Sequence, residues 1–245
     1  MLNGLWQLSE GQPLWGIERV REGPLLTPPR PLRCIYFSQE DTIDDLNDRI
    51  TLLRGAGWQT NRNIYFVPKN LKLSFDELGL PLLMSEINQA AQDGPIDLVG
   101  FDPMRRMYRG NENDSETIAG LWKVLDTVHE RFNCSTWFNH HIVKPPRDSN
   151  SSWDETSPFA GRGSGDIYGG GDAFINIVQR HTRGRPKNMR LLDFHFETKR
   201  GGELSPVTLN VNFLTGELSF VGFCEGRGAK DKSLKPEDIT DELTK

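Results

Sequence analysis

The chain has 245 residues, of which 36% are hydrophobic and 26% charged, and its formal net charge at pH 7 is −5. This composition is typical of a folded α/β domain, excludes a largely disordered chain, and provides no overall positive field that would attract nucleic acid. No apolar run approaches the ~18 residues of a membrane span, and the N-terminal segment lacks a signal-peptide pattern, so we expect a soluble cytoplasmic protein. The three cysteines form no CxxC pair, so we expect their thiols to be reduced.

Short apolar runs alternate with helical patterns over the first part of the chain. The alternation predicts an α/β fold, with a mostly parallel sheet covered by helices on both faces. Thr42 and Asp45 have the spacing of a capping box, and Asp114 or Ser115 is the candidate N-cap of a later helix. The predicted elements, in chain order, are a strand at 33–38, a helix at 42–55, a strand at 63–67, a helix at 82–92, a strand at 96–102, an amphipathic helix through 118–128 and a strand at 134–141.

The later part of the chain has a different pattern. Residues 145–172 are rich in Pro, Ser, Gly and Asp, and we expect a mobile loop there. Residues 224–245 are charged and nearly devoid of large apolar side chains, which predicts a flexible tail after a single domain over residues 1–223. Between loop and tail, four alternating segments predict antiparallel strands on the C-terminal side that extend the sheet, at 173–178, 189–198, 206–213 and 217–223.

Chemically capable side chains follow three of the predicted parallel strands. Ligands of open α/β sheets bind at the carboxyl ends of the strands, so we expect these side chains to converge on one ligand. Asp102 closes the apolar run IDLVGFD and is typical of a residue that holds a Mg²⁺-bound water, with a cap of the following turn as the equal alternative. The candidates are Glu40 and Asp41, Asp102, and His140 with His141.

Glu40 is a candidate for orienting or deprotonating an attacking water, and its alternative is a first-turn carboxylate favoured by the helix dipole. His140 and His141 are candidates for polarising a phosphate. Because adjacent residues of a strand point to opposite faces, we expect one of the two to face the site. As metal ligands they lack a third His or Cys at a recognisable spacing.

A glycine-rich segment and two basic clusters complete the candidates. The segment GRGSGDIYGGGD at 161–172 is not a P-loop, because no Lys-Ser/Thr pair follows the glycines, and we interpret it as a loop with weak anion-binding character. The clusters RHTRGRPKNMR at 180–190 and ETKRGGE at 197–203 are interpreted as solvated hairpin tips. Contacts to a phosphate backbone, or a charge donated to a neighbouring active site, are the alternatives.

The order of the motifs YFSQED, IDLVGFDPMRRM with GNENDSE, WFNHHIVKP and GRGSGD resembles the RecA-like P-loop ATPases. The likeness is closest to the group near the hexameric plasmid helicase RepA, more distant to DnaB-type replicative helicases, and covers residues 5–222. It implies a RecA-like ATPase domain over residues 1–223 that acts in DNA replication or recombination. ATP and Mg²⁺ are the implied cofactors, and single-stranded DNA and a homo-oligomeric ring, such as a hexamer, the implied partners.

The resemblance also implies roles for individual residues of the nucleotide site. Glu40 matches the catalytic glutamate that activates water, and Asp102 matches the Walker B aspartate that holds Mg²⁺ through water. One of His140 or His141 matches the polar residue that couples nucleotide state to the DNA-binding loops. The remaining residues that we assign to the cofactor on this basis are Asp41, His141 and Lys199.

Two further matches concern DNA and ring assembly. Arg162, Gly163 and Ser164 match the RGS segment that lies towards the central channel, and are the implied DNA-binding residues. Arg200 resembles the arginine finger that enters the site of the adjacent subunit. Lys199 directly precedes it, one position away from the lysine of the family's KxRxG hairpin.

The front of the chain departs from the family pattern, because no GxxxxGK[ST] occurs in the 245 residues. We expect either an N-terminally truncated product or a degenerate member that does not hydrolyse ATP, and the retained Glu40 and Asp102 favour truncation. Two other hypotheses stay open. One is a non-hydrolysing module that binds DNA or a partner, and the other is a metal-dependent hydrolase that uses Asp102, His140 and His141.

Overall fold

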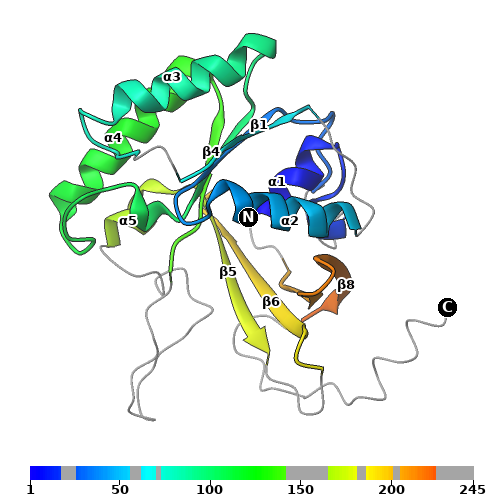
Figure 1. The fold of residues 1–245 in the computed structure, drawn as a ribbon. Coiled ribbons are helices and arrows are strands. Elements are labelled where there is room, and N and C mark those ends of the chain that lie inside the picture. Colours follow the sequence, from blue (N-terminus) through cyan, green and yellow to red (C-terminus); the bar gives the residue numbers. More distant parts are fainter. Residues whose placement is uncertain are drawn as a thin grey trace, which may run out of the picture.

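The computed structural model describes residues 1–17, 26–55, 62–69, 73–141, 165–180, 186–200 and 205–224. A four-stranded parallel sheet in the order β2-β1-β3-β4 lies at the centre (Figure 1). All three pairs of neighbouring strands are parallel, and a helical segment connects each strand to the next in the chain, so the predicted parallel sheet is confirmed. The strands are β1 (Cys34–Ser38), β2 (Ile64–Val67), β3 (Leu98–Asp102) and β4 (Ser135–Phe138).

Helices cover both faces of this sheet. Helices α1 (Leu2–Ser9) and α2 (Ile43–Gly55) pack on one face, and α3 (Leu80–Ala90) and α4 (Ser115–Phe132) pack on the other (Figure 1). Three short 3₁₀ turns also lie in this part of the chain: η1 (Leu14–Gly16), η2 (Ala91–Asp93) and η3 (Met104–Arg106). None of the described helices is long and apolar enough to cross a membrane.

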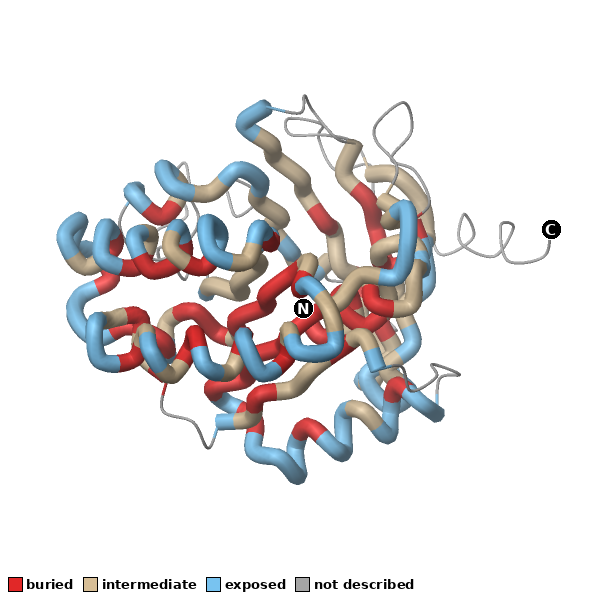
Figure 2. Tube along the Cα trace, turned by 90° about the horizontal axis from the view of Figure 1, so that it is seen from above, coloured by how far each residue is buried: buried red, intermediate tan, exposed pale blue. Residues whose placement is uncertain are grey.

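The alternation of side chains along β1 supplies both halves of the core. Cys34 and Tyr36 join the cluster formed with α1 and α2, whereas Ile35 and Phe37 join the cluster formed with α3 and α4. All five residues of β1 are buried, as expected of a central strand between two helical layers. Buried residues accordingly run through the central strands in Figure 2, and exposed residues line the outer sides of the helices.

Two helices begin where the sequence places capping residues. The N–H of Thr42 donates to Asp45 Oδ2 at 2.9 Å, and the N–H of Asp45 donates to Thr42 Oγ1 at 3.2 Å, so the predicted capping box is confirmed. Asp114 caps α4, because its Oδ2 accepts the N–H of Thr117 at 3.0 Å. The helix ends at Phe132 and is followed by its C-cap Asn133, which adopts the left-handed conformation with φ 49°.

The C-terminal strands are antiparallel, as predicted, but they form a second sheet in the order β5-β6-β7-β8. The expectation that they extend the first sheet is wrong: among the described residues, no strand of one sheet pairs with a strand of the other. An alternating pattern identifies strands but does not determine which strands pair. Here strands that are consecutive in the chain form hydrogen bonds with one another. The strands are β5 (Ala173–Arg180), β6 (Met189–Thr198), β7 (Val207–Asn212) and β8 (Glu217–Phe223).

Aromatic side chains join the two sheets. The ring of Trp15 lies 5.9 Å from that of Trp137 on β4, edge to face, and 4.6 Å from that of Phe194 on β6. Trp15 has a left-handed backbone with φ 54°, and its N–H donates to Oε1 of Gln7 at 2.6 Å. The N-terminal segment therefore forms a bridge between the sheets through side-chain packing.

Part of the expected loop at 145–172 is helical. Residues 142–164 lie outside the described residues, but α5 (Gly165–Gly170) follows them. Nε1 of Trp122 donates to the carbonyl oxygen of Asp166 at 3.0 Å, and the ring of Tyr168 stacks on Phe174 at 4.7 Å. These contacts with α4 and β5 stabilise a turn whose glycine-rich sequence does not predict a helix.

Candidate functional site

The predicted carboxylates meet at the carboxyl edge of β1 and β3. These strands pair in parallel with Ser38 opposite Asp102, and Glu40 and Asp41 follow the end of β1 after Gln39. The N–H of Gln39 donates to the carbonyl oxygen of Asp102 at 2.8 Å and fixes the two strand ends together. The chain positions of Glu40, Asp41 and Asp102 therefore lie at one sheet edge, and their convergence on a single ligand stays a prediction.

The carboxylate of Asp102 is held by two donors that sequence reasoning missed. The hydroxyl of Tyr36 donates to Oδ2 at 2.6 Å, and Nδ2 of Asn139 donates to Oδ1 at 3.1 Å. Burial, followed by the negative charge of Asp102, raises the pKa of Tyr36, so the phenol keeps its proton and remains a donor. With one donor on each oxygen, the carboxylate is fixed in orientation and keeps further lone pairs for a ligand.

Neither donor has a clear sequence signal. Tyr36 lies within a run of buried strand residues and is itself fully buried, so it is indistinguishable from a core aromatic residue. Asn139 directly precedes the histidine pair and follows the end of β4. A polar residue after an apolar strand is the only available signal, and the adjacent histidines are the more conspicuous candidates.

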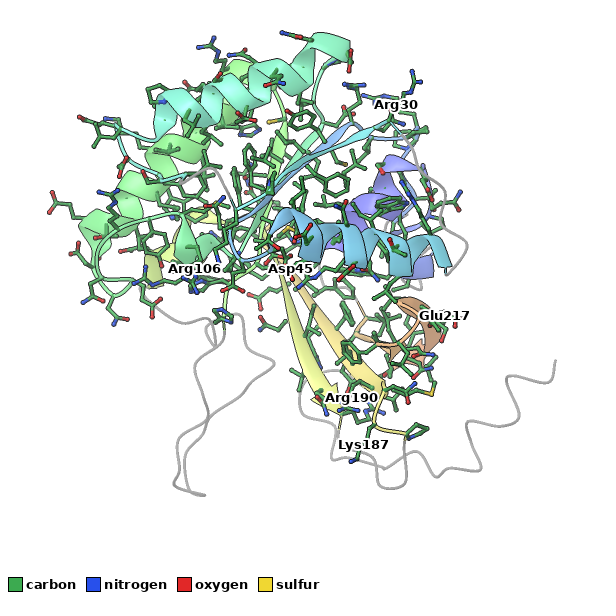
Figure 3. The ribbon with its side chains drawn as sticks, in the orientation of Figure 1. Arg30, Asp45, Arg106, Lys187, Arg190 and Glu217 are labelled. Atoms are coloured by element: carbon green, nitrogen blue, oxygen red, sulfur yellow. The ribbon has the colours of Figure 1, made fainter. Side chains whose placement is uncertain are left out.

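Glu40 lies at the surface of the same edge. Its Oε1 is 3.4 Å from Nε of Arg106, and the two side chains are 49% and 62% exposed. Arg106 is carried to this position by η3, which begins just after Asp102 (Figure 3). Arg106 lies beside Arg105 in the motif IDLVGFDPMRRM, and no sequence signal distinguishes the two arginines.

Asp41 is buried in a local network. Its Oδ2 accepts the hydroxyl of Ser38 at 3.2 Å, and its Oδ1 lies 3.0 Å from Nη2 of Arg49 on α2. The backbone N–H of Asp41 donates to the same hydroxyl at 3.1 Å. These contacts join the end of β1 to α2, and the nucleotide contact expected of Asp41 stays a prediction.

His140 and His141 follow β4 instead of ending it. The strand ends at Phe138, so the expectation of a strand through residue 141, and with it the argument from alternating faces, is wrong. His140 is half-buried and His141 is exposed. Over the parts of the chain that the structure describes, no three His, Cys, Asp or Glu side chains are grouped so as to hold a metal ion.

The candidates from the C-terminal half lie on the second sheet or outside the described residues. Lys199 follows β6, and its Nζ donates to the carbonyl oxygen of Gly169 and lies 5.2 Å from the centre of the Tyr168 ring. Arg200 beside it is exposed. The predicted DNA-binding residues, Arg162, Gly163 and Ser164, lie outside the described residues, as does the predicted tail apart from Cys224.

The basic cluster at 180–190 is described only at its ends. Arg180 pairs with Asp193 at 2.9 Å, whereas Lys187 and Arg190 lie at the tip of the second sheet, well away from Arg106 (Figure 3). A hollow of about 550 Å³ lies between α4 and α5, where Trp122, Lys123 and Asp166 are among its lining residues. Glu40, Asp41 and Asp102 are not among the lining residues of that hollow. The function of the sheet edge that carries these three residues, called the carboxylate edge below, is therefore inferred from side-chain chemistry.

Comparison with known proteins gives one family. A family model described as an AAA domain matches residues 3–147, which is more than half of the chain. The matched span contains all four parallel strands and the residues Tyr36, Glu40, Asp102, Arg106 and Asn139. No curated protein matches the sequence significantly.

Proposed function

The chain belongs to the AAA-domain family, and we propose that it is a RecA-like ATPase of the helicase type that acts on DNA. The observation that carries this proposal is the placement of Glu40 and Asp102 at the ends of two adjacent parallel strands. A carboxylate that activates water and a carboxylate that holds the metal shell are both needed for hydrolysis of a phosphoanhydride. The family match supports an ATPase-type domain, and the likeness to the RepA group supports the DNA helicase assignment.

The carboxylate edge fits Mg²⁺ in its donor chemistry. Mg²⁺ prefers oxygen ligands and keeps several of its waters, and Asp102 offers a carboxylate already oriented by Tyr36 and Asn139. Bound Mg²⁺ would supply charge neutralisation at the phosphates. The lysine of a GxxxxGK[ST] motif, which contacts the β- and γ-phosphates in P-loop sites, is not found among the 245 residues.

Glu40 and Asp102 have separate tasks in this proposal. Glu40 is exposed and can accept a proton from an attacking water at its carboxylate oxygen. Asp102, held by two donors, would hold a Mg²⁺-bound water through its remaining lone pairs. Differing environments of two neighbouring carboxylates are the usual basis for such a division of roles.

DNA binding and ring assembly rest on the sequence resemblance. Arg162, Gly163 and Ser164 would contact single-stranded DNA, and Arg200 would enter the site of an adjacent subunit. One of His140 or His141 would sense the nucleotide, with Asp41 and Lys199 supporting the cofactor. The domain would span residues 1–223.

The test combines binding and turnover in the full chain. A fluorescent ATP analogue is titrated with Mg²⁺, with and without single-stranded DNA, and phosphate release is then measured for the wild type and Glu40→Gln. We expect Glu40→Gln to abolish turnover and retain binding, whereas the control Asp44→Asn, which removes an exposed carboxylate from α2, behaves as wild type. Equal loss of binding and turnover in Glu40→Gln would contradict the assigned role.

A second candidate function is a non-hydrolysing RecA-like module that binds DNA or a protein partner. The absence of GxxxxGK[ST] from the 245 residues favours it. DNA binding without saturable binding of the ATP analogue is the result that would select this alternative. A metal-dependent hydrolase built on Asp102, His140 and His141 would instead require a tightly bound transition metal, which elemental analysis of the purified protein detects.

A further inference from the structure

Arg106 lies at the carboxylate edge on a turn that is held in place by buried residues. Met104 is fully buried, and its N–H donates to the carbonyl oxygen of Asn139 at 2.9 Å. Met107, which follows Arg106, is also fully buried, and its N–H donates to the carbonyl oxygen of Met104 at 2.9 Å. The backbone of Arg106 is therefore fixed between two core side chains, while its own side chain is 62% exposed.

The contact between Arg106 and Glu40 is easily exchanged. An exposed ion pair with an N–O distance of 3.4 Å contributes at most about 1 kcal/mol, because water screens both charges. The neighbouring Arg105 differs: it pairs with the buried Glu112 and donates to the carbonyl oxygen of Tyr108 at 3.3 Å. Arg105 therefore stabilises its own loop, whereas Arg106 holds only a surface carboxylate among its described contacts.

We propose that Arg106 binds the terminal phosphate of a nucleoside triphosphate in its own subunit, exchanging the carboxylate of Glu40 for phosphate oxygens. This inference rests on the proposed function, which places the triphosphate beside Glu40. A guanidinium matches phosphate oxygens with two parallel N–H donors, and such charge-assisted hydrogen bonds are stronger than an exposed ion pair.

The exchange has two effects on the site. It redirects the positive charge of Arg106, which is already at this edge, from the carboxylate of Glu40 to the phosphate oxygens. It also releases Glu40 from its ion pair, so that the carboxylate can accept a hydrogen bond from water. Arrival of the triphosphate and release of the water-activating group are thereby one event.

The experiment measures dissociation constants of a fluorescent ATP analogue and of the matching ADP analogue, with tripolyphosphate as competitor. Arg106→Gln is compared with Arg109→Gln, which removes an exposed arginine from the same segment. We expect Arg106→Gln to weaken binding of ATP and tripolyphosphate about tenfold or more, as for a lost charge-assisted hydrogen bond, and to change ADP binding little. Arg109→Gln is expected to bind all three as the wild type does.

A double-mutant cycle tests the exchange itself. Glu40→Gln removes the competing carboxylate, so we expect it to tighten ATP binding several-fold when Arg106 is present. The same substitution made on Arg106→Gln is expected to leave ATP binding unchanged. A tightening that persists without Arg106 overturns the inference, because the effect would then come from general charge.

The remaining outcomes separate this inference from the proposed function. Wild-type affinity in Arg106→Gln, or an equal loss for ATP and ADP, overturns the role of Arg106 and leaves the ATPase proposal standing. Binding of tripolyphosphate that depends on Arg106, without binding of ATP, supports the phosphate contact and overturns the ATPase proposal. If wild type and Glu40→Gln bind neither ligand, both are overturned.

Discussion

The phenol of Tyr36 and the carboxylate of Asp102 are joined by a hydrogen bond of 2.6 Å between adjacent parallel strands. Tyr36 is fully buried between the sheet and the layer of α1 and α2, and Asp102 ends the neighbouring strand at the carboxylate edge. A core side chain thus reaches the candidate site directly. Packing of the sheet and orientation of Asp102 are consequently coupled through one atom.

Replacing Tyr36 by Phe removes that atom and little else. We expect a loss of about 1–3 kcal/mol in the free energy of unfolding, because Oδ2 of Asp102 loses a donor in a half-buried position. Urea denaturation followed by circular dichroism measures the loss. The control is Tyr65→Phe on β2, whose tyrosine packs against the other face. An equal loss in both variants would show that the hydroxyl bond to Asp102 is not the cause.

Asn139 and Tyr36 act on the same carboxylate, so their substitutions are expected to be non-additive. Asn139→Ala removes the donor to Oδ1, and the double variant with Tyr36→Phe leaves Asp102 without either hydrogen bond. We expect a coupling free energy of about 0.5–3 kcal/mol in the unfolding cycle. Strict additivity, measured by the same denaturation experiment, would mean that the two donors do not share one rigid carboxylate.

Trp15 is expected to contribute strongly to stability, because it packs between the two sheets. Trp15→Ala removes the contacts with Trp137 and Phe194 and should cost about 3–5 kcal/mol in the free energy of unfolding. Trp15→Phe retains an aromatic ring and should cost clearly less. Thermal and urea unfolding monitored by far-ultraviolet circular dichroism compare the two variants, and an equal cost would contradict the packing of an aromatic ring between the two sheets as the explanation.

The buried cysteines are expected to lower the free energy of unfolding in alkaline solution. Burial, followed by the charge of Asp97, raises the pKa of the Cys34 thiol from 9.0 to about 12, and burial raises that of Cys134 from 9.0 to about 11. In the unfolded chain these thiols ionise from about pH 9, whereas the folded protein keeps them protonated. The stabilisation is therefore complete below pH 9 and is lost as pH rises through 11–12, by at most about 1.4 kcal/mol per pH unit for each thiol.

Urea unfolding at pH 7–10.5 measures this decline. Cys34→Ala lacks one of the two thiols, so its free energy of unfolding should fall less steeply above pH 9 than that of the wild type. Cys224→Ala is compared as well: burial also raises the pKa of this half-buried thiol, so its removal should change the slope in the same direction. Parallel slopes for wild type and Cys34→Ala would show that Cys34 does not govern the alkaline decline.

The parallel half of the fold could be predicted because its signals are local. The apolar runs ending at Ser38 and Asp102, the capping box at Thr42 and Asp45, and the Asp114 cap are each confirmed within a few residues. These features depend on neighbouring residues and on burial on both faces of the strands. Hence the edge where the carboxylates meet also followed from the order of elements.

Features that depend on distant contacts could not be predicted in the same way. Trp122 from another element contacts the helix α5, and the second sheet packs against the first through Trp15 and Phe194, which are far apart in the sequence. Tyr36 was indistinguishable from an ordinary core residue until its hydroxyl could be placed beside Asp102. The contact between Arg106 and Glu40 is likewise visible only in the structure.

The pairing register of β1 and β3 also constrains how the sequence can change. Side chains alternate along β1, so a shift of one residue would turn Tyr36 towards α3 and α4 and place a neighbour such as Phe37 where the phenol now lies. A single-residue insertion or deletion within CIYFS could leave a hydrophobic strand buried on both sides and still remove the donor from Asp102. The length of this strand is thus under chemical constraint, independent of how apolar its residues are.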